Sequence, residues 1–186
     1  MKVEQIYTGC LAQGAYYIKS KNEVAIIDPL REIKPYLERS ERDGAKIKYI
    51  FETHFHADFV SGHVDLSRAT GAPIIYGPNA NPSFEAIIAE DGQIFELGDI
   101  KIKVLHTPGH TRGGITLLLE KPIDKIAFTG DTLFCQGIGR SDLSGGDEEL
   151  LIKSIKEKLF TLPPETKIYP GHGKPSTIGE EKNNLR

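Results

Sequence analysis

Four strand-like segments of this chain each lead into a histidine or an aspartate. The segments and the residues that follow them are 47–53 with His54, 100–106 with His110, 125–129 with Asp131, and 166–170 with His172. In α/β folds, rigid strands aim the residues of the following loops at one point, and ligands bind there. The sequence therefore predicts an α/β fold with a functional site where these four strand ends meet.

The remaining pattern predicts two sheets that are covered by helices. The expected strands are 3–8, 15–20, 23–29, 47–53, 72–77, 93–98, 100–106, 115–121, 125–129 and 166–170, and the expected helices are 31–43, 58–70, 147–162 and a short closing helix. Strands come first, and strand and helix then alternate in two similar halves, which indicates a layered architecture. A length of 186 residues suits a single domain over residues 1–186 with a sizeable core.

Composition narrows the classes of partner. The net charge is −3 and no basic block occurs, so no nucleic-acid partner is expected. No apolar run approaches the ~20 residues that span a bilayer, and the first residues do not form a signal peptide, so no membrane partner is expected. Two cysteines are too few for a disulfide framework, which favours a reducing, cytoplasmic location. The sequence leaves a homodimer open.

The loop after the fourth strand carries a metal-ligand pattern. His54 and His56 alternate with Phe55, so an extended backbone would turn both imidazoles to one side, and Asp58 follows two residues later. Together with His110, Asp131 and His172, these are good ligands for zinc, iron or manganese. The other two histidines, His63 and His106, are interpreted as ordinary surface or core residues.

Four motifs resemble the metallo-β-lactamase superfamily, in the same order along the chain. They are THFHAD (53–58), TPGHT (107–111), GDTLF (130–134) and YPGHG (169–173). The resemblance implies an αββα sandwich with the metal site at one edge of the two sheets. In two-metal members, the matching first-site ligands would be His54, His56 and His110. Asp58, residue 59 and His172 would bind the second metal, and Asp131 would bridge.

Residue 59 is a phenylalanine, which cannot bind a metal. The segment ETHFHADFVSGH (52–63), with TGCLAQGAYYI (8–18) and AIIDPLRE (25–32), is similar to bacterial persulfide dioxygenases. That resemblance implies one Fe(II) per chain, held by His54, His110 and Asp131, and oxidation of glutathione persulfide or a similar persulfide by O2 to sulfite and thiol. His56, Asp58 and His172 would then orient ligands and handle protons.

The second half of the chain is more similar to small glyoxalase II-type hydrolases. GIGRSDLSGGDEE (137–149) and IYPGHGKPSTIGEEK (168–182) carry this resemblance. The alternative function is therefore hydrolysis of glutathione thioesters such as S-lactoylglutathione, with zinc, iron or manganese. A metal-binding or redox-sensing module without enzymatic activity is a third class, which the open coordination positions disfavour.

Three further residues have both a functional and a structural interpretation. Arg140 matches an arginine that both groups carry near the substrate, where it would bind a carboxylate; a structural ion pair is the alternative. Cys10 and Cys135 could meet a sulfur substrate, although packing as small apolar residues is the favoured interpretation.

Overall fold

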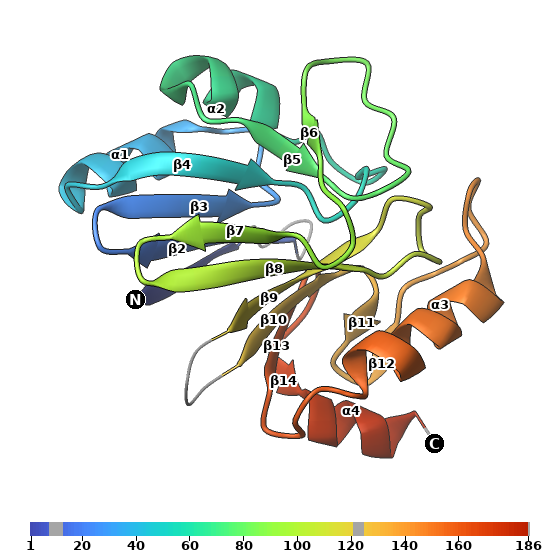
Figure 1. The fold of residues 1–186 in the computed structure, drawn as a ribbon. Coiled ribbons are helices and arrows are strands. Elements are labelled where there is room, and N and C mark those ends of the chain that lie inside the picture. The colour runs from blue at the N-terminus through green and yellow to red at the C-terminus, as the bar shows by residue number, and fades with distance from the viewer. Residues whose placement is uncertain (8–12, 121–124, 186) are drawn as a thin grey trace.

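The computed structural model describes residues 1–7, 13–120 and 125–185, and Figure 1 shows two sheets packed face to face. The first sheet has the order β1 (Lys2–Tyr7), β2 (Gly14–Ser20), β3 (Glu23–Ile27), β4 (Lys46–Phe51), β5 (Ile74–Tyr76) and β6 (Ile87–Ile88). The second has the order β14 (Ser176–Thr177), β13 (Lys167–Pro170), β10 (Ile126–Gly130), β9 (Ile115–Glu120), β8 (Ile100–His106) and β7 (Ile94–Leu97). A hairpin of β11 (Leu133–Phe134) and β12 (Gly137–Ile138) stands apart.

Helices cover the outer faces of both sheets. They are α1 (Lys34–Arg42), α2 (His63–Thr70), α3 (Glu148–Ser154), a π-helix η1 (Ile155–Leu159) and α4 (Ile178–Asn184). In Figure 1, α1 and α2 lie beside the first sheet, and α3 and α4 lie beside the second. None of these described helices is both long and apolar enough to cross a membrane.

The layers follow from strands that are buried on both faces. In β2, Tyr16 and Ile18 pack between the two sheets, whereas Tyr17 packs under α1 and α2 with Tyr36 and Leu66. A third cluster fills the space between the second sheet and α3, η1 and α4. Because side chains alternate along a strand, a strand between two apolar layers is apolar at nearly every position. The predicted αββα sandwich is confirmed.

Strand direction brings the polar loops to one edge. β8 and β10 are both antiparallel to β9, and β10 is parallel to β13, so these three strands end on the same side. At this edge the two sheets are joined by the hydrogen bonds Ile115 N to Thr53 O and Gly14 N to Gly171 O, both 2.8 Å long.

Two predicted helices differ from the structure. The helix expected over 58–70 begins only at His63, because Gly62 packs against the loop that follows β3. The N–H of Gly62 donates to Pro29 O in that loop at 2.9 Å. A Cβ on Gly62 would lie 2.4 Å from Leu30 O. The helix expected over 147–162 becomes a π-helix at its second half, where Phe160 N donates to Ile155 O at 2.8 Å.

Candidate metal centre

Three histidine nitrogens surround one oxygen of Asp131. The Nε2 atoms of His54, His110 and His172 lie 3.8, 3.7 and 3.5 Å from Asp131 Oδ2. These residues follow β4, β8 and β13, while Asp131 follows β10. Among the described residues, His54, His110 and Asp131 form a group whose ligand atoms all lie within 4.8 Å of one another. The structure thus brings together the three residues expected to hold the metal.

Hydrogen bonds fix the tautomers of two of these histidines. Thr53 Oγ1 donates its only hydrogen to Asp28 Oδ2 at 2.7 Å, so it accepts from His54 Nδ1 at 2.9 Å. His110 Nδ1 lies 2.7 Å from the carbonyl oxygen of Arg140, which can only accept. Both Nδ1 atoms therefore carry the hydrogen, and both Nε2 lone pairs face the Asp131 carboxylate.

The electrostatics favour a cation between these groups. Burial, and next the neighbouring His56, lower the pKa of His54 well below its usual value. Burial acts to raise the pKa of Asp131, but His172, His54 and His110 outweigh it, and the pKa is lowered. The neutral imidazole of His54 and the carboxylate of Asp131 both present lone pairs to each other, and a cation bound between them would remove this repulsion. Two histidines and one carboxylate fit Fe(II), zinc or manganese.

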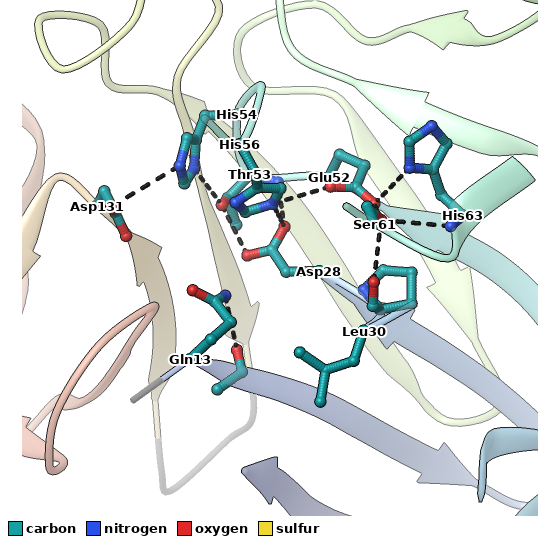
Figure 2. A network of polar contacts seen from close by, with 12 residues as sticks. Gln13, Asp28, Leu30, Glu52, Thr53, His54, His56, Ser61, His63 and Asp131 are labelled. Carbon is teal, nitrogen blue, oxygen red and sulfur yellow. Dashed lines mark hydrogen bonds and ion pairs between the residues drawn. The ribbon is translucent and has the colours of Figure 1, made fainter. Parts of the chain in front are cut away.

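His56 is turned to a second polar cluster, in which Asp28 and Glu52 are buried (Figure 2). Its ring packs 4.1 Å from the His54 ring, while Phe55 stacks on Tyr76, as the alternating pattern predicted. His56 Nε2 lies 3.2 Å from Asp28 Oδ1 and 2.9 Å from Glu52 Oε2. Burial acts to lower the pKa of His56, but the two carboxylates raise it well above its usual value. His56 Nδ1 is also buried and has no hydrogen-bond partner among the described residues.

Glu52 connects this cluster to helix α2. Its Oε1 accepts from Ser61 Oγ at 2.5 Å and lies 3.2 Å from His63 Nδ1. The sequence interpretation of His63 as an ordinary residue missed this contact. It also missed Glu52 and Asp28, for which the only signal was an acidic residue at the end of a buried strand. Asp28 has a positive φ of 49°, a strained conformation that often marks a functional region.

The expected second metal position has two of its residues close together but lacks one ligand. Asp58 Oδ2 lies 3.2 Å from His172 Nε2, beside Asp131. Phe59 offers no donor atom, and its ring packs 4.3 Å from that of His56. His106, which was interpreted as an ordinary residue, lies near the carbonyl oxygen of Arg112 at 3.1 Å, away from this group.

A cavity of about 590 Å³ opens over the metal-binding group. Its apolar wall is made of Phe134, Ile138 and Leu143, and Arg140 is also on its lining. The guanidinium of Arg140 makes a bidentate pair with Asp142, with both hydrogen bonds 2.8 Å long. Since this pair is mostly exposed, it adds little stability, and three N–H groups of Arg140 remain for a ligand.

Of the two cysteines, Cys135 lies in the described part of the chain. Cys135 is half-buried and lines a different cavity, together with Lys174. Cys10 lies outside the described residues.

Gly171 provides the space that Asp131 needs. A Cβ at this position would lie 2.4 Å from Asp131 Oδ1, so an added methyl group must displace the carboxylate. We expect Gly171→Ala to weaken zinc binding by about 10- to 100-fold, as for other changes behind a ligand, measured by competition with a chelator. Gly137→Ala is the matched control, because its Cβ would meet nothing within 4 Å. Equal weakening in both variants would contradict this prediction.

Comparison with known proteins supports this description. The family model of the metallo-β-lactamase superfamily matches residues 8–172. The hydroxyacylglutathione hydrolase GloC of Haemophilus influenzae is 34% identical, over 98% of this chain and 95% of the relative. The crystal structure of ETHE1 from Myxococcus xanthus matches with a TM-score of 0.92 and 31% identity, over 99% of this chain and 83% of the other.

A third relative is described with its metal. TTHA1623, solved in a di-iron-bound form, matches with a TM-score of 0.81 and 29% identity, over 97% of this chain and 98% of the other. The superfamily match, the fold and the donor group agree. The chain therefore belongs to the metallo-β-lactamase superfamily of metal-dependent enzymes.

Proposed function

We propose that the protein is an Fe(II)-dependent persulfide dioxygenase with one iron per chain. The observation that carries the proposal is the three-donor group of His54, His110 and Asp131, next to a second position where Phe59 supplies no ligand. In the reaction, glutathione persulfide, O2 and water give glutathione, sulfite and two protons. The outer sulfur is oxidised and O2 is reduced.

The residues around the site have separate tasks. His54, His110 and Asp131 would hold Fe(II), which, when bound with three open positions, supplies sites for the persulfide sulfur and O2 and the electrons that activate O2. Asp58 Oδ2, paired with His172 Nε2 at 3.2 Å, accepts the S–H proton of the entering persulfide. The apolar wall of Phe134, Ile138 and Leu143 limits the access of water.

Arg140 is proposed as the contact for a substrate carboxylate. Its Nε and one Nη2 hydrogen bind Asp142, and the edge formed by Nη1 and Nη2 still offers two parallel donors. The similarity to a hydroxyacylglutathione hydrolase supports a glutathione-like thiol as the substrate class, and the match with ETHE1 supports the dioxygenase.

The second candidate is a hydrolase of glutathione thioesters that uses zinc, iron or manganese. The Asp58–His172 pair beside Asp131 favours it, because Asp58 is placed to deprotonate a water molecule. The similarity to GloC over nearly the whole chain also supports it.

One experiment separates the two candidates. Oxygen uptake and sulfite are measured on Fe(II)-loaded protein with glutathione persulfide, and iron content is measured on the same sample. Uptake with equimolar sulfite and close to one iron per chain is the expected result. The absence of uptake, together with cleavage of S-lactoylglutathione by zinc- or manganese-loaded protein, would replace the dioxygenase by the hydrolase.

The role of Phe59 can be tested through metal stoichiometry. Phe59→His restores a donor beside Asp58 and His172, so bound metal should rise from about one toward two ions per chain. Phe59→Leu is the control, because it changes the side chain without adding a donor, and it should leave the stoichiometry at one. An unchanged metal content of Phe59→His after full loading would show that Phe59 does not limit the site.

Several sequence predictions concern the protein as a whole. The single domain over residues 1–186, the cytoplasmic location, the homodimer and the absence of nucleic-acid and membrane partners stay predictions.

A further inference from the structure

Two buried oxygen atoms close to the metal-binding group, in the described part of the chain, lack a hydrogen-bond donor. They are Oδ1 of Asp131 and Oε1 of Gln13. Gln13 is 0% exposed, and among the described residues its Nε2 makes only a long 3.4 Å contact with the carbonyl oxygen of Gly14. A buried oxygen without a donor is costly, so two of them in one region require an explanation.

Both oxygens belong to residues that contact the segment 171–172. Gln13 forms an antiparallel bridge with His172, and Gly14 N donates to Gly171 O at 2.8 Å. Paired residues of neighbouring strands project their side chains to the same face. Because His172 Nε2 lies 3.5 Å from Asp131 Oδ2, Gln13 projects from the face of this bridge on which Asp131 lies.

The other oxygen of Asp131 faces this segment directly. Asp131 Oδ1 is the atom that a Cβ on Gly171 would meet at 2.4 Å. Figure 2 shows the carboxamide of Gln13 on the Asp131 side of the site, with its oxygen turned that way.

The nitrogen and oxygen of a carboxamide have nearly the same shape, and only the hydrogen-bond network tells them apart. Exchanging the two atoms of Gln13 turns an N–H toward Asp131, while Oε1 takes the place of Nε2 at 3.4 Å from Gly14 O. We propose that Gln13 is a positioning residue: its side-chain N–H donates to Asp131 Oδ1 and holds Oδ2 where the three histidine Nε2 atoms converge.

This inference rests on the proposed role of Asp131 as a metal ligand. A neutral donor on Oδ1 fixes the plane of the carboxylate and leaves its charge intact, so Oδ2 stays available to the cation. Carboxylates that bind metals are commonly held in this way, and loss of such a partner costs about 10- to 100-fold in metal affinity.

The test compares two variants of Gln13 by Co(II) binding, with the dissociation constant and the visible absorption spectrum as readouts. Gln13→Met keeps the length of the side chain and removes the donor; it should bind Co(II) about 10- to 100-fold more weakly, with an altered spectrum. Gln13→Glu replaces the donor by a charged acceptor and should also alter the spectrum. Gln93→Met, at a half-buried turn where the side chain accepts from Glu90 N, should match the wild type.

A second measurement does not depend on whether these variants fold. In the metal-free wild type, the side-chain amide resonances of Gln13 should show slowed hydrogen exchange and should shift in Asp131→Asn. Wild-type Co(II) affinity and spectrum in Gln13→Met, or Gln13 resonances that are insensitive to Asp131→Asn, would overturn the proposal.

The outcomes also separate this inference from the proposed function. If Asp131→Asn loses Co(II) while Gln13→Met binds it normally, only the role of Gln13 is wrong. If Asp131→Asn binds Co(II) as the wild type does, Asp131 is not a ligand, and both proposals are overturned.

Discussion

Replacing Asp131 by asparagine is expected to lower kcat/KM for the metal-dependent reaction by about 1,000-fold, which corresponds to roughly 4 kcal/mol of lost metal catalysis. Asp131 is the only anion in the three-donor group, and its Oδ2 lies between 3.5 and 3.8 Å from three histidine nitrogens. Without its charge, the imidazoles have no anionic partner with which to hold a divalent cation.

The fold should survive this change. In the metal-free variant, the newly introduced side-chain amide can donate to the Nε2 lone pairs of His54 and His110, which face a carboxylate in the wild type. Thermal unfolding of the metal-free variant should therefore occur at or above the wild-type temperature, while metal analysis shows almost no bound ion. Asp99→Asn, at an exposed ion pair with Lys21, is the control and should keep its metal. Normal metal content in Asp131→Asn would contradict the assignment.

Replacing Glu52 by glutamine is expected to lower the free energy of unfolding by about 3 kcal/mol at pH 7, because it breaks a buried ion pair on one side. Glu52 is 0% exposed, and its carboxylate lies 2.9 Å from His56 and 3.2 Å from His63. Glutamine has the same shape but no charge, so the packing stays, while His63 loses this anionic neighbour and His56 loses one of its two. For a chain of this size, the loss corresponds to a fall of about 6 to 12 °C in Tm.

The effect should depend on pH in a defined direction. Burial acts to raise the pKa of Glu52, but His56 and His63 outweigh it and hold the pKa at about 2, below its ordinary value of 4.5. A carboxyl group with a depressed pKa in the folded state stabilises the fold above pH 4.5, and this contribution is lost as the pH falls toward about 2. Urea unfolding of metal-free protein should therefore show a smaller difference between wild type and Glu52→Gln at pH 3 than at pH 7.

A surface substitution provides the control for this measurement. Glu165→Gln, at an exposed position, should unfold like the wild type at both pH values. A difference between wild type and Glu52→Gln that stays constant with pH would show that the charge of Glu52 does not stabilise this cluster.

The sequence alone determined the layered fold and the segments that form its longer strands. Apolar runs at nearly every position, as in β2 and β9, are what two buried faces require, and this pattern is local. Each histidine or aspartate of the donor group follows a strand within four residues, so strand direction brings these side chains to one edge. These features could be predicted because each depends on a few neighbouring residues.

Only the tertiary structure decided how the donor atoms are oriented. Asp28, acting through Thr53, determines which ring nitrogen of His54 carries the hydrogen. For His110, the carbonyl oxygen of Arg140, 30 positions further along the chain, does the same. The start of α2 at His63 and the position of Glu52 likewise depend on contacts with other segments. Periodicity carries no information about such contacts, because a hydrogen bond between distant segments exists only once the sheets and loops have packed.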